Sequence, residues 1–207
     1  QLAMEKKIIA DLVVPVPDSG NAAAIGYSQY TGIPFDLGLI RNHYVGRTFI
    51  EPAQKIRSLG VKLKLNANKS SINNKKIILI DDSLVRGTTS HKIVNMLYDA
   101  GAKEVHMAVA CPEIKYPDFY GVDMPTKKEL LAANKTIKEI CEYINAKSLN
   151  FLSIDGLYKA MGFEKRNENY PQLTDHYFTG EYPVKPIDEL GDNKVTQLSL
   201  LSTASNN

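Results

Sequence analysis

Two adjacent carboxylates, Asp81 and Asp82, follow a run of four large apolar residues at 77–80. The run is typical of a strand buried on both faces, and the apolar pattern of 90–100 predicts a helix after it. Backbone N–H groups at such a helix start can hold a phosphate, while the carboxylates can meet sugar hydroxyls or a divalent metal. The alternative is a solvated acidic turn. The glycine and two threonines at 87–89 disfavour it, because they add phosphate-binding groups.

A second candidate loop, Asp18-Ser19-Gly20, lies between an apolar strand pattern and a helical pattern. Its small residues and backbone N–H groups would suit a diphosphate, although an ordinary turn with a helix cap explains this loop equally well when it is taken alone. A third candidate, at 41–52, contains Arg41, Gly46 and Arg47 and has no clean periodicity. Such a loop suits a flexible lid that closes over a polyanion and excludes water; a plain surface loop is the alternative.

The elements that would position these loops alternate along the chain. The patterns predict strands at 10–16, 35–40, 61–65, 77–80, 104–110 and 149–154 and helices at 21–30, 90–100, 127–133, 136–145 and 155–161, the last capped by Asp155. Alternating strands and helices indicate an α/β fold with a parallel, doubly wound sheet, whose ligand lies at the carboxyl ends of the strands. Past residue 162 the composition becomes polar and rich in Tyr and Pro, which predicts an irregular C-terminal tail, partly disordered.

Composition excludes several classes of function. The chain has 207 residues, 43% of them hydrophobic, and a net charge of +2, so its overall field does not suggest a nucleic-acid partner. No run of eighteen apolar residues is present, so we expect no membrane span. Cys111 and Cys141 have no metal-ligand spacing, which favours a reduced, cytoplasmic protein with both thiols in the core. The start at Gln1 suggests the middle of a longer protein.

Several motifs together resemble one known family. The segment 80–89 is similar to the signature of the type I phosphoribosyltransferases, which bind phosphoribosyl pyrophosphate. The segments 14–20, 42–50, 64–68 and 120–125 resemble, in the same order, motifs of the amidophosphoribosyltransferases. The resemblance implies a type I phosphoribosyltransferase fold over 1–162, followed by the extension 163–207. It also implies the synthesis of 5-phosphoribosylamine from phosphoribosyl pyrophosphate and ammonia, the first step of purine synthesis.

The resemblance also implies roles for individual residues. A Mg2+ ion would be associated with Ser19, Asp81 and Asp82. The 5′-phosphate would be received by Ser83, Arg86, Gly87, Thr88 and Thr89. The pyrophosphate loop would consist of Asp18, Ser19 and Gly20. The closing lid would contribute Tyr44, Arg47 and Thr48 to catalysis.

Partners and cofactors follow from the same resemblance. The whole enzymes carry an N-terminal glutaminase domain that supplies ammonia, and we expect that domain to be absent from this chain. Homo-oligomers and inhibition by purine nucleotides are further implied. One branch of the family holds an iron–sulfur cluster with a cysteine before Phe-Tyr-Gly and a pair near Phe-Thr-Gly. Here Asp118 takes the first place and 169–176 contains no cysteine, so we predict no cluster.

Three other functions are compatible with part of the pattern. A nucleobase phosphoribosyltransferase would need a base-recognition hood, and the match at 44–50 disfavours it. A regulator that senses phosphoribosyl pyrophosphate would need a DNA-binding segment, and the sequence has no basic helix-turn-helix pattern. A signalling receiver domain would use Asp81 and Asp82 with Asp123 as phospho-acceptor, but Asp123 follows a loop-like segment instead of an apolar strand.

Overall fold

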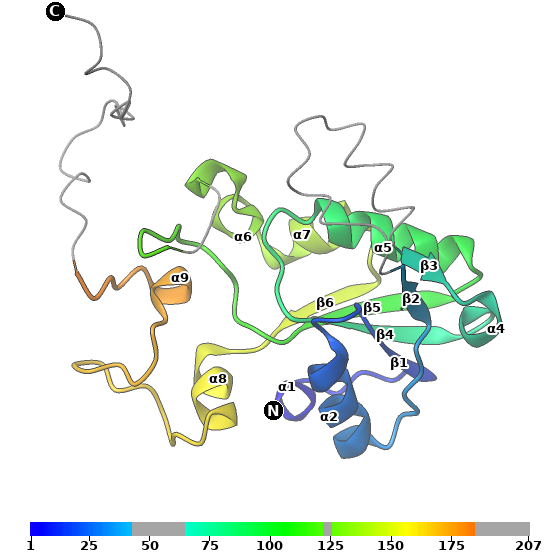
Figure 1. The fold of residues 1–207 in the computed structure, drawn as a ribbon, viewed down its shortest axis with the longest axis horizontal. Coiled ribbons are helices and arrows are strands. Elements are labelled where there is room, and N and C mark those ends of the chain that lie inside the picture. The colour runs from blue at the N-terminus through cyan, green and yellow to red at the C-terminus, as the bar shows by residue number, and fades with distance from the viewer. Residues whose placement is uncertain (43–64, 122–125, 185–207) are drawn as a thin grey trace, which may run out of the picture.

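A four-stranded parallel sheet forms the centre of the molecule (Figure 1). The computed structural model describes residues 1–42, 65–121 and 126–184. The strands are β1 (Leu12–Pro15), β4 (Lys76–Asp81), β5 (Glu104–Val109) and β6 (Ser148–Phe151), in the order β1-β4-β5-β6. All three pairings between neighbours are parallel, with Pro15 opposite Ile80 and Asp81 opposite Val109. The predicted parallel sheet is confirmed.

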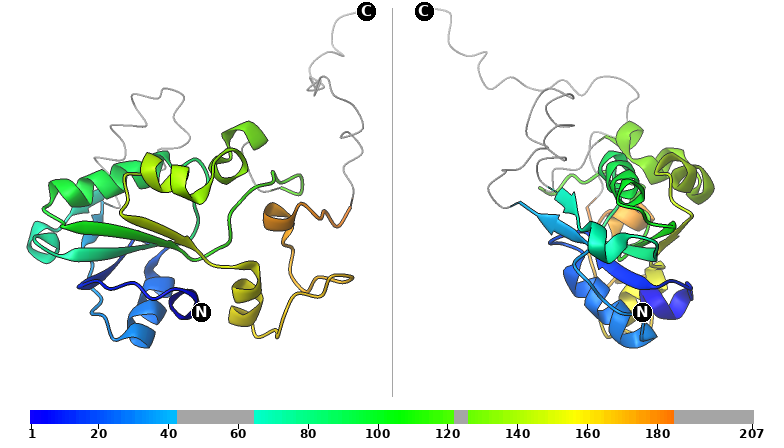
Figure 2. Two further views of the ribbon diagram at one scale, coloured as in Figure 1. Left: turned by 180° about the vertical axis from the view of Figure 1, so that it is seen from behind. Right: turned by 90° about the vertical axis from the view of Figure 1, so that its right-hand side faces the viewer.

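Helices cover both faces of this sheet (Figures 1 and 2). One face carries α1 (Leu2–Glu5), α2 (Asn21–Thr31) and α8 (Ile154–Ala160), and the other carries α5 (Thr88–Asp99), α6 (Leu131–Asn134) and α7 (Ile137–Tyr143). Strand β4 is sandwiched between them: Ile77 and Leu79 pack on the α5 side, whereas Ile78 and Ile80 pack on the α2 side. All four side chains have zero exposed surface, which explains the unbroken apolar run that marked this strand in the sequence.

A second, two-stranded sheet stands at one edge of the central sheet. Strands β2 (Leu39–Arg41) and β3 (Leu65–Ala67) pair antiparallel, and α4 (Lys69–Ile72) follows. The predicted strand at 35–40 therefore begins too early. Phe35 forms only an isolated bridge with Val13 of β1, and β2 begins at Leu39. Most of the predicted strand at 61–65 lies outside the described residues.

Two predicted helices differ in detail. The segment 127–133 is a 3-10 turn, η2 (Lys127–Glu129), and then α6, because Leu130 between them has an extended backbone. The expected cap of the helix at 155–161 is wrong: Ser153 is the N-cap residue of α8, and its Oγ accepts from the N–H of Gly156 at 2.8 Å. Asp155 lies instead within the first turn.

The C-terminal segment 163–184 folds back on the loop that follows β5. Its short helix α9 (His176–Thr179) places His176 Nε2 2.7 Å from Asp118 Oδ1, and neither side chain has exposed surface. Arg166 donates to Asp175, which also accepts from the hydroxyl of Tyr158 at 2.7 Å. These polar contacts hold the segment against α8 and the β5 loop. The predicted domain boundary at residue 162 stays a prediction.

None of the helices in the described ranges is long and apolar enough to cross a membrane. Cys111 and Cys141 are free thiols of intermediate exposure, packed against the cluster of α7 and β6. Both thiols were expected in the core, but they are only partly buried and pack against its edge.

Candidate active site

The turn Asp18-Ser19-Gly20 lies against the carboxyl end of β4. The N–H of Val16 donates to the carbonyl of Ile80 at 2.8 Å, which joins the residue after β1 to the carboxyl end of β4. Gly20 packs on the same carbonyl so closely that a Cβ atom there would lie 2.4 Å from the Ile80 oxygen. Only glycine fits this contact. The first predicted loop and the acidic pair are thus brought together, as their positions at neighbouring strand ends require.

The turn leads directly into α2, whose start lacks a side-chain cap. The N–H groups of Gly20 and Asn21 are used inside the turn, because they donate to Val16 and Asp18. The N–H of Ala24 closes the first helical hydrogen bond to Gly20. The donors at this helix start are therefore fewer than the sequence pattern suggested, and those that remain belong to the first turn of α2.

Asp81 is the buried member of the acidic pair, with 8% of its surface exposed. Its Oδ1 accepts from the N–H of Asp82 at 2.9 Å and faces the Ser19 hydroxyl at 3.5 Å. Burial, and then the neighbouring Asp82, raise the pKa of the Asp81 carboxyl well above its usual value. A carboxylate placed in this way lacks a compensating cation among the described residues that contact it.

The segment 83–87 wraps around the start of α5 and forms what we call the phosphate loop. Gly87 is the helix N-cap, with φ of 70°, and has no side chain to occupy the first-turn N–H groups. The hydroxyls of Thr88 and Thr89 stand in that same turn. Open N–H donors, hydroxyls and the positive end of a twelve-residue helix are the groups that bind a phosphate.

Arg41 joins the site from the second sheet. It was predicted as part of a loop, but it ends strand β2, and its guanidinium forms an ion pair with Asp18. Its Nε is buried and has no hydrogen-bond partner among the described residues. Arg41 thus places a cationic group beside the turn predicted to receive pyrophosphate.

A segment distant in the sequence supports the phosphate loop from behind, and local sequence patterns do not predict it. Glu129 accepts from Nε of Arg86 at 3.3 Å, and the N–H of Leu131 donates to the carbonyl of Val85 at 2.9 Å. A Cβ atom on Gly87 would lie 2.5 Å from the side chain of Leu131. No periodicity or spacing in the sequence relates Glu129 or Leu131 to this loop.

Cys111 is a further neighbour of the acidic pair. Its Sγ donates to the carbonyl of Pro112 at 3.2 Å. Burial, followed by the negative charge of Asp82, raises the pKa of the Cys111 thiol to about 12. The thiol is therefore neutral at physiological pH and cannot serve as a nucleophile there.

The structure unites ten of the thirteen predicted site residues at one edge of the sheet. They are Asp18, Ser19, Gly20, Asp81, Asp82, Ser83, Arg86, Gly87, Thr88 and Thr89. Tyr44, Arg47 and Thr48 lie outside the described residues, as does Asp123 of the receiver-domain alternative. Within the described ranges, no group of three His, Cys, Asp or Glu side chains could hold a metal.

The donor set nevertheless fits a hard cation. Ser19, Asp81 and Asp82 offer only oxygen atoms, which Mg2+ prefers, and Asp81 is a buried carboxylate with a raised pKa. Mg2+ commonly keeps few protein ligands and takes the rest from substrate phosphates and water. Two carboxylates and a hydroxyl are therefore consistent with a magnesium site that the substrate completes.

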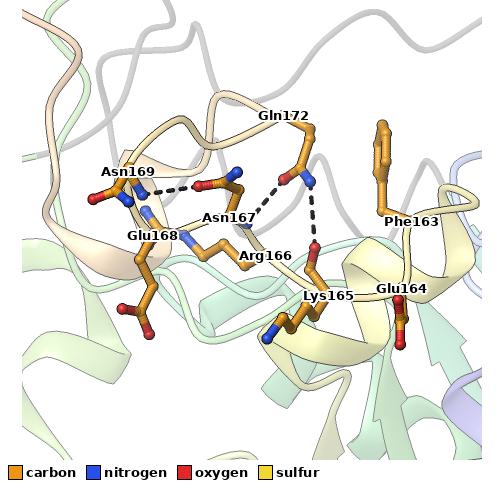
Figure 3. A pocket seen from close by; sticks show the side chains of 8 residues that line it. All are labelled: Phe163, Glu164, Lys165, Arg166, Asn167, Glu168, Asn169 and Gln172. Atoms are coloured by element: carbon orange, nitrogen blue, oxygen red, sulfur yellow. Dashed lines mark hydrogen bonds between the residues drawn. The ribbon is translucent and has the colours of Figure 1, made fainter.

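A separate cavity lies away from this edge. The loop of the C-terminal segment lines it with Phe163, Glu164, Lys165, Arg166, Asn167, Glu168, Asn169 and Gln172 (Figure 3). Hydrogen bonds within the loop hold these lining residues in place; for example, the N–H of Asn167 donates to Gln172 Oε1 at 3.1 Å. None of the predicted site residues borders it, so it is not the candidate active site.

Comparison with known proteins gives consistent matches. No family model matches the chain. The amidophosphoribosyltransferase of Rhizobium etli is 56% identical over 203 residues, which are 98% of this chain and 41% of that protein. Amidophosphoribosyltransferase 1 of Arabidopsis thaliana, a chloroplastic protein, is 51% identical over 90% of this chain and 32% of its own length. The chain thus spans less than half the length of these relatives.

A solved structure matches the fold as well as the sequence. Glutamine phosphoribosylpyrophosphate amidotransferase from Bacillus subtilis, complexed with ADP and GMP, superposes with a TM-score of 0.79 at 47% identity. The match covers 91% of this chain and 41% of that one. In its sequence and its type I phosphoribosyltransferase fold, the chain is therefore similar, over nearly its whole length, to one part of the amidophosphoribosyltransferases.

Proposed function

We propose that this chain carries out the phosphoribosyl transfer of an amidophosphoribosyltransferase. Ammonia attacks C1 of phosphoribosyl pyrophosphate, the C1–O bond to pyrophosphate breaks, and the products are 5-phosphoribosylamine, pyrophosphate and a proton. One observation carries the proposal: the turn 18–20, the pair Asp81–Asp82 and the phosphate loop converge at one edge of the sheet. This constellation suits a ribose that carries phosphates at both ends.

The 5′-phosphate would lie at the start of α5. The first-turn N–H groups and the hydroxyls of Thr88 and Thr89 would donate to it, and Arg86 would add positive charge. At the other end of the sugar, the turn 18–20 would receive the pyrophosphate, with Arg41 close by. Asp81 and Asp82 would accept hydrogen bonds from the ribose hydroxyls between these two anchors.

Ser19, Asp81 and Asp82 would hold the Mg2+ ion. When bound, Mg2+ would neutralise negative charge that develops on the leaving pyrophosphate. The residues of the chain itself would bind and orient the substrate, so that ammonia needs no side-chain nucleophile. This role is consistent with the neutral Cys111 thiol beside the pair.

Two further parts of the proposal are a lid that closes over the site and a source of ammonia. Tyr44, Arg47 and Thr48 would cover the bound substrate and exclude water, which would otherwise hydrolyse the activated sugar. A glutaminase domain would supply the ammonia, as the name of the Bacillus subtilis relative, a glutamine amidotransferase, suggests. Cytoplasmic location and assembly into a homo-oligomer stay predictions.

Purine nucleotides would act as inhibitors. The Bacillus subtilis structure holds ADP and GMP. A nucleoside 5′-monophosphate contains the same ribose 5-phosphate unit as the substrate, so it would compete for the phosphate loop and the acidic pair. The competition would show as a higher apparent KM for phosphoribosyl pyrophosphate with an unchanged kcat.

Replacing the acidic pair tests the site. The double substitution Asp81→Asn with Asp82→Asn should lower pyrophosphate release from phosphoribosyl pyrophosphate, Mg2+ and ammonia by at least about 100-fold. The matched control is Asp99→Asn, an exposed residue at the opposite end of α5, which should keep full turnover. Undiminished turnover in a folded double variant would refute the site.

A further inference from the structure

The segment 127–134 contacts the phosphate loop although it lies some forty residues away in sequence. Three contacts join the two: the ion pair from Arg86 to Glu129, the hydrogen bond from Leu131 to Val85, and the packing of Leu131 on Gly87. They reach three successive residues of the loop. The segment therefore supports the second half of the loop, and we call it the loop brace.

The brace has a defined internal structure. The side-chain amide of Asn134 donates to the carbonyls of Lys127, Lys128 and Leu130, at 2.8, 3.3 and 2.7 Å. These bonds close the turn η2 and fix the backbone on both sides of Glu129. The backbone that carries Glu129 is therefore held in place by hydrogen bonds from Asn134.

We propose that Glu129 is a positioning residue for Arg86 in the binding of the 5′-phosphate. Glu129 accepts only from Nε of Arg86, so both terminal nitrogens of the guanidinium stay without a partner among the described residues. A phosphate can take those two donors side by side. Glu129 would hold the guanidinium in the orientation that offers them.

Glu129 would strengthen phosphate binding by restricting the rotamers of Arg86 before the phosphate binds. An exposed arginine has many rotamers, and a phosphate must order them when it binds. The bond to Nε orders the side chain before the substrate arrives, so less entropy is lost on binding. Glu129 also lowers the local positive charge, but the N–H groups of α5 keep the site attractive to an anion. Since the pair is half exposed on both sides, the effect is small and measurable.

The inference rests on the proposed function, and its test separates the two. The purified chain is titrated with ribose 5-phosphate and, separately, with pyrophosphate, both with Mg2+. Glu129→Ala should weaken ribose 5-phosphate binding about two- to fivefold and leave pyrophosphate binding unchanged. Glu129→Gln keeps an acceptor oxygen and should restore most of the loss. Lys128→Ala in the same turn is the control and should bind both ligands like the unaltered chain.

A double-substitution cycle decides whether Glu129 acts through Arg86. In an Arg86→Ala background, Glu129→Ala should have no further effect on ribose 5-phosphate binding. An equal loss in both backgrounds, tighter binding by Glu129→Ala, or an equal loss for both ligands would each overturn the inference. If the unaltered chain bound neither ligand, the proposed function would fail and the inference with it.

Discussion

At the scale of single residues, the fold holds Asp81 in an unfavourable place. The carboxylate is buried, stands next to Asp82, and receives only a backbone N–H at short distance. Burial first, and Asp82 second, raise its pKa well above the usual value. The charged form of Asp81 is therefore unfavourable in this place, and a cation bound with the substrate would stabilise it. Such a trade of stability for binding is common at functional sites.

Asp81→Asn should make the protein more stable when no substrate is added. We expect the free energy of unfolding at neutral pH to rise by about 1–2 kcal/mol, because a neutral amide carries no charge that burial would make unfavourable. The raised pKa means that the unaltered protein gains stability as the pH falls through the native pKa of Asp81, so the difference between the two proteins should shrink there. Urea unfolding at several pH values measures this; a destabilised variant at neutral pH would contradict it.

Cys111 should resist alkylation in the folded protein. With its pKa raised to about 12 by burial and by Asp82, the thiolate fraction at pH 8 is about three orders of magnitude below that of a free cysteine. Iodoacetamide labelling followed by mass spectrometry should show Cys111 modified only after unfolding. Rapid labelling of Cys111 in the native protein would show that the thiol is not held as described.

At the scale of elements, two glycines set how closely the loops approach the sheet and its helices. Gly20 allows the first loop to lie on the carbonyl of Ile80, and Gly87 allows the phosphate loop to pass under Leu131. Both contacts are made between segments far apart in the sequence. They explain why a turn that was ambiguous in isolation becomes part of a site once β1 and β4 are paired.

Gly20→Ala should disrupt the first loop. A Cβ atom 2.4 Å from the Ile80 oxygen forces the backbone apart, which should cost about 2 kcal/mol of stability and weaken pyrophosphate binding. Gly26→Ala in the middle of α2 is the matched control, since its Cβ would meet nothing within 4 Å. Helix propensity should make that control more stable by about 1 kcal/mol. Thermal unfolding of both variants measures these effects. Equal shifts in Tm for Gly20→Ala and Gly26→Ala would contradict this account.

At the scale of the whole molecule, the C-terminal segment is joined to the domain by buried polar contacts. Burial acts to raise the pKa of Asp175, but hydrogen bonds from Arg166 and Tyr158 outweigh it and lower that pKa below its usual value. Asp175 therefore contributes stability above the ordinary carboxyl range, and this contribution is lost as the pH falls through its native pKa. The segment should detach from the domain in acid.

Tyr158→Phe should loosen this attachment. The substitution removes the hydroxyl that donates to Asp175 at 2.7 Å in a buried place, which should cost about 1–2 kcal/mol. Limited proteolysis should then cut the segment 163–184 faster than in the unaltered chain. Tyr30→Phe, at an exposed position of α2, is the control. Equal cleavage rates for all three proteins would show that the hydroxyl does not stabilise the attachment.

The architecture, and the meeting of the candidate loops at one edge of the sheet, could be predicted because local patterns encode them. The apolar run at 77–80, the glycine and hydroxyls after it, and the order of strands and helices are all signals within a few residues. Contacts across the fold could not be predicted in this way. The pairing of Glu129 with Arg86 and of His176 with Asp118 joins residues that no periodicity or spacing relates. The cap at Ser153 was missed because Asp155 is an equally good capping residue by type.

The central claim is that the converging loops form a site for phosphoribosyl pyrophosphate, and product formation tests it most directly. The purified chain is incubated with phosphoribosyl pyrophosphate, Mg2+ and 15N-labelled ammonia, while pyrophosphate is assayed and the sugar product is followed by NMR. The account predicts pyrophosphate release that requires ammonia, in equal amount to a 5-phosphoribosylamine that carries 15N at C1. Folded protein that releases no pyrophosphate above the enzyme-free rate, or releases it without a 15N-labelled product, would contradict the account.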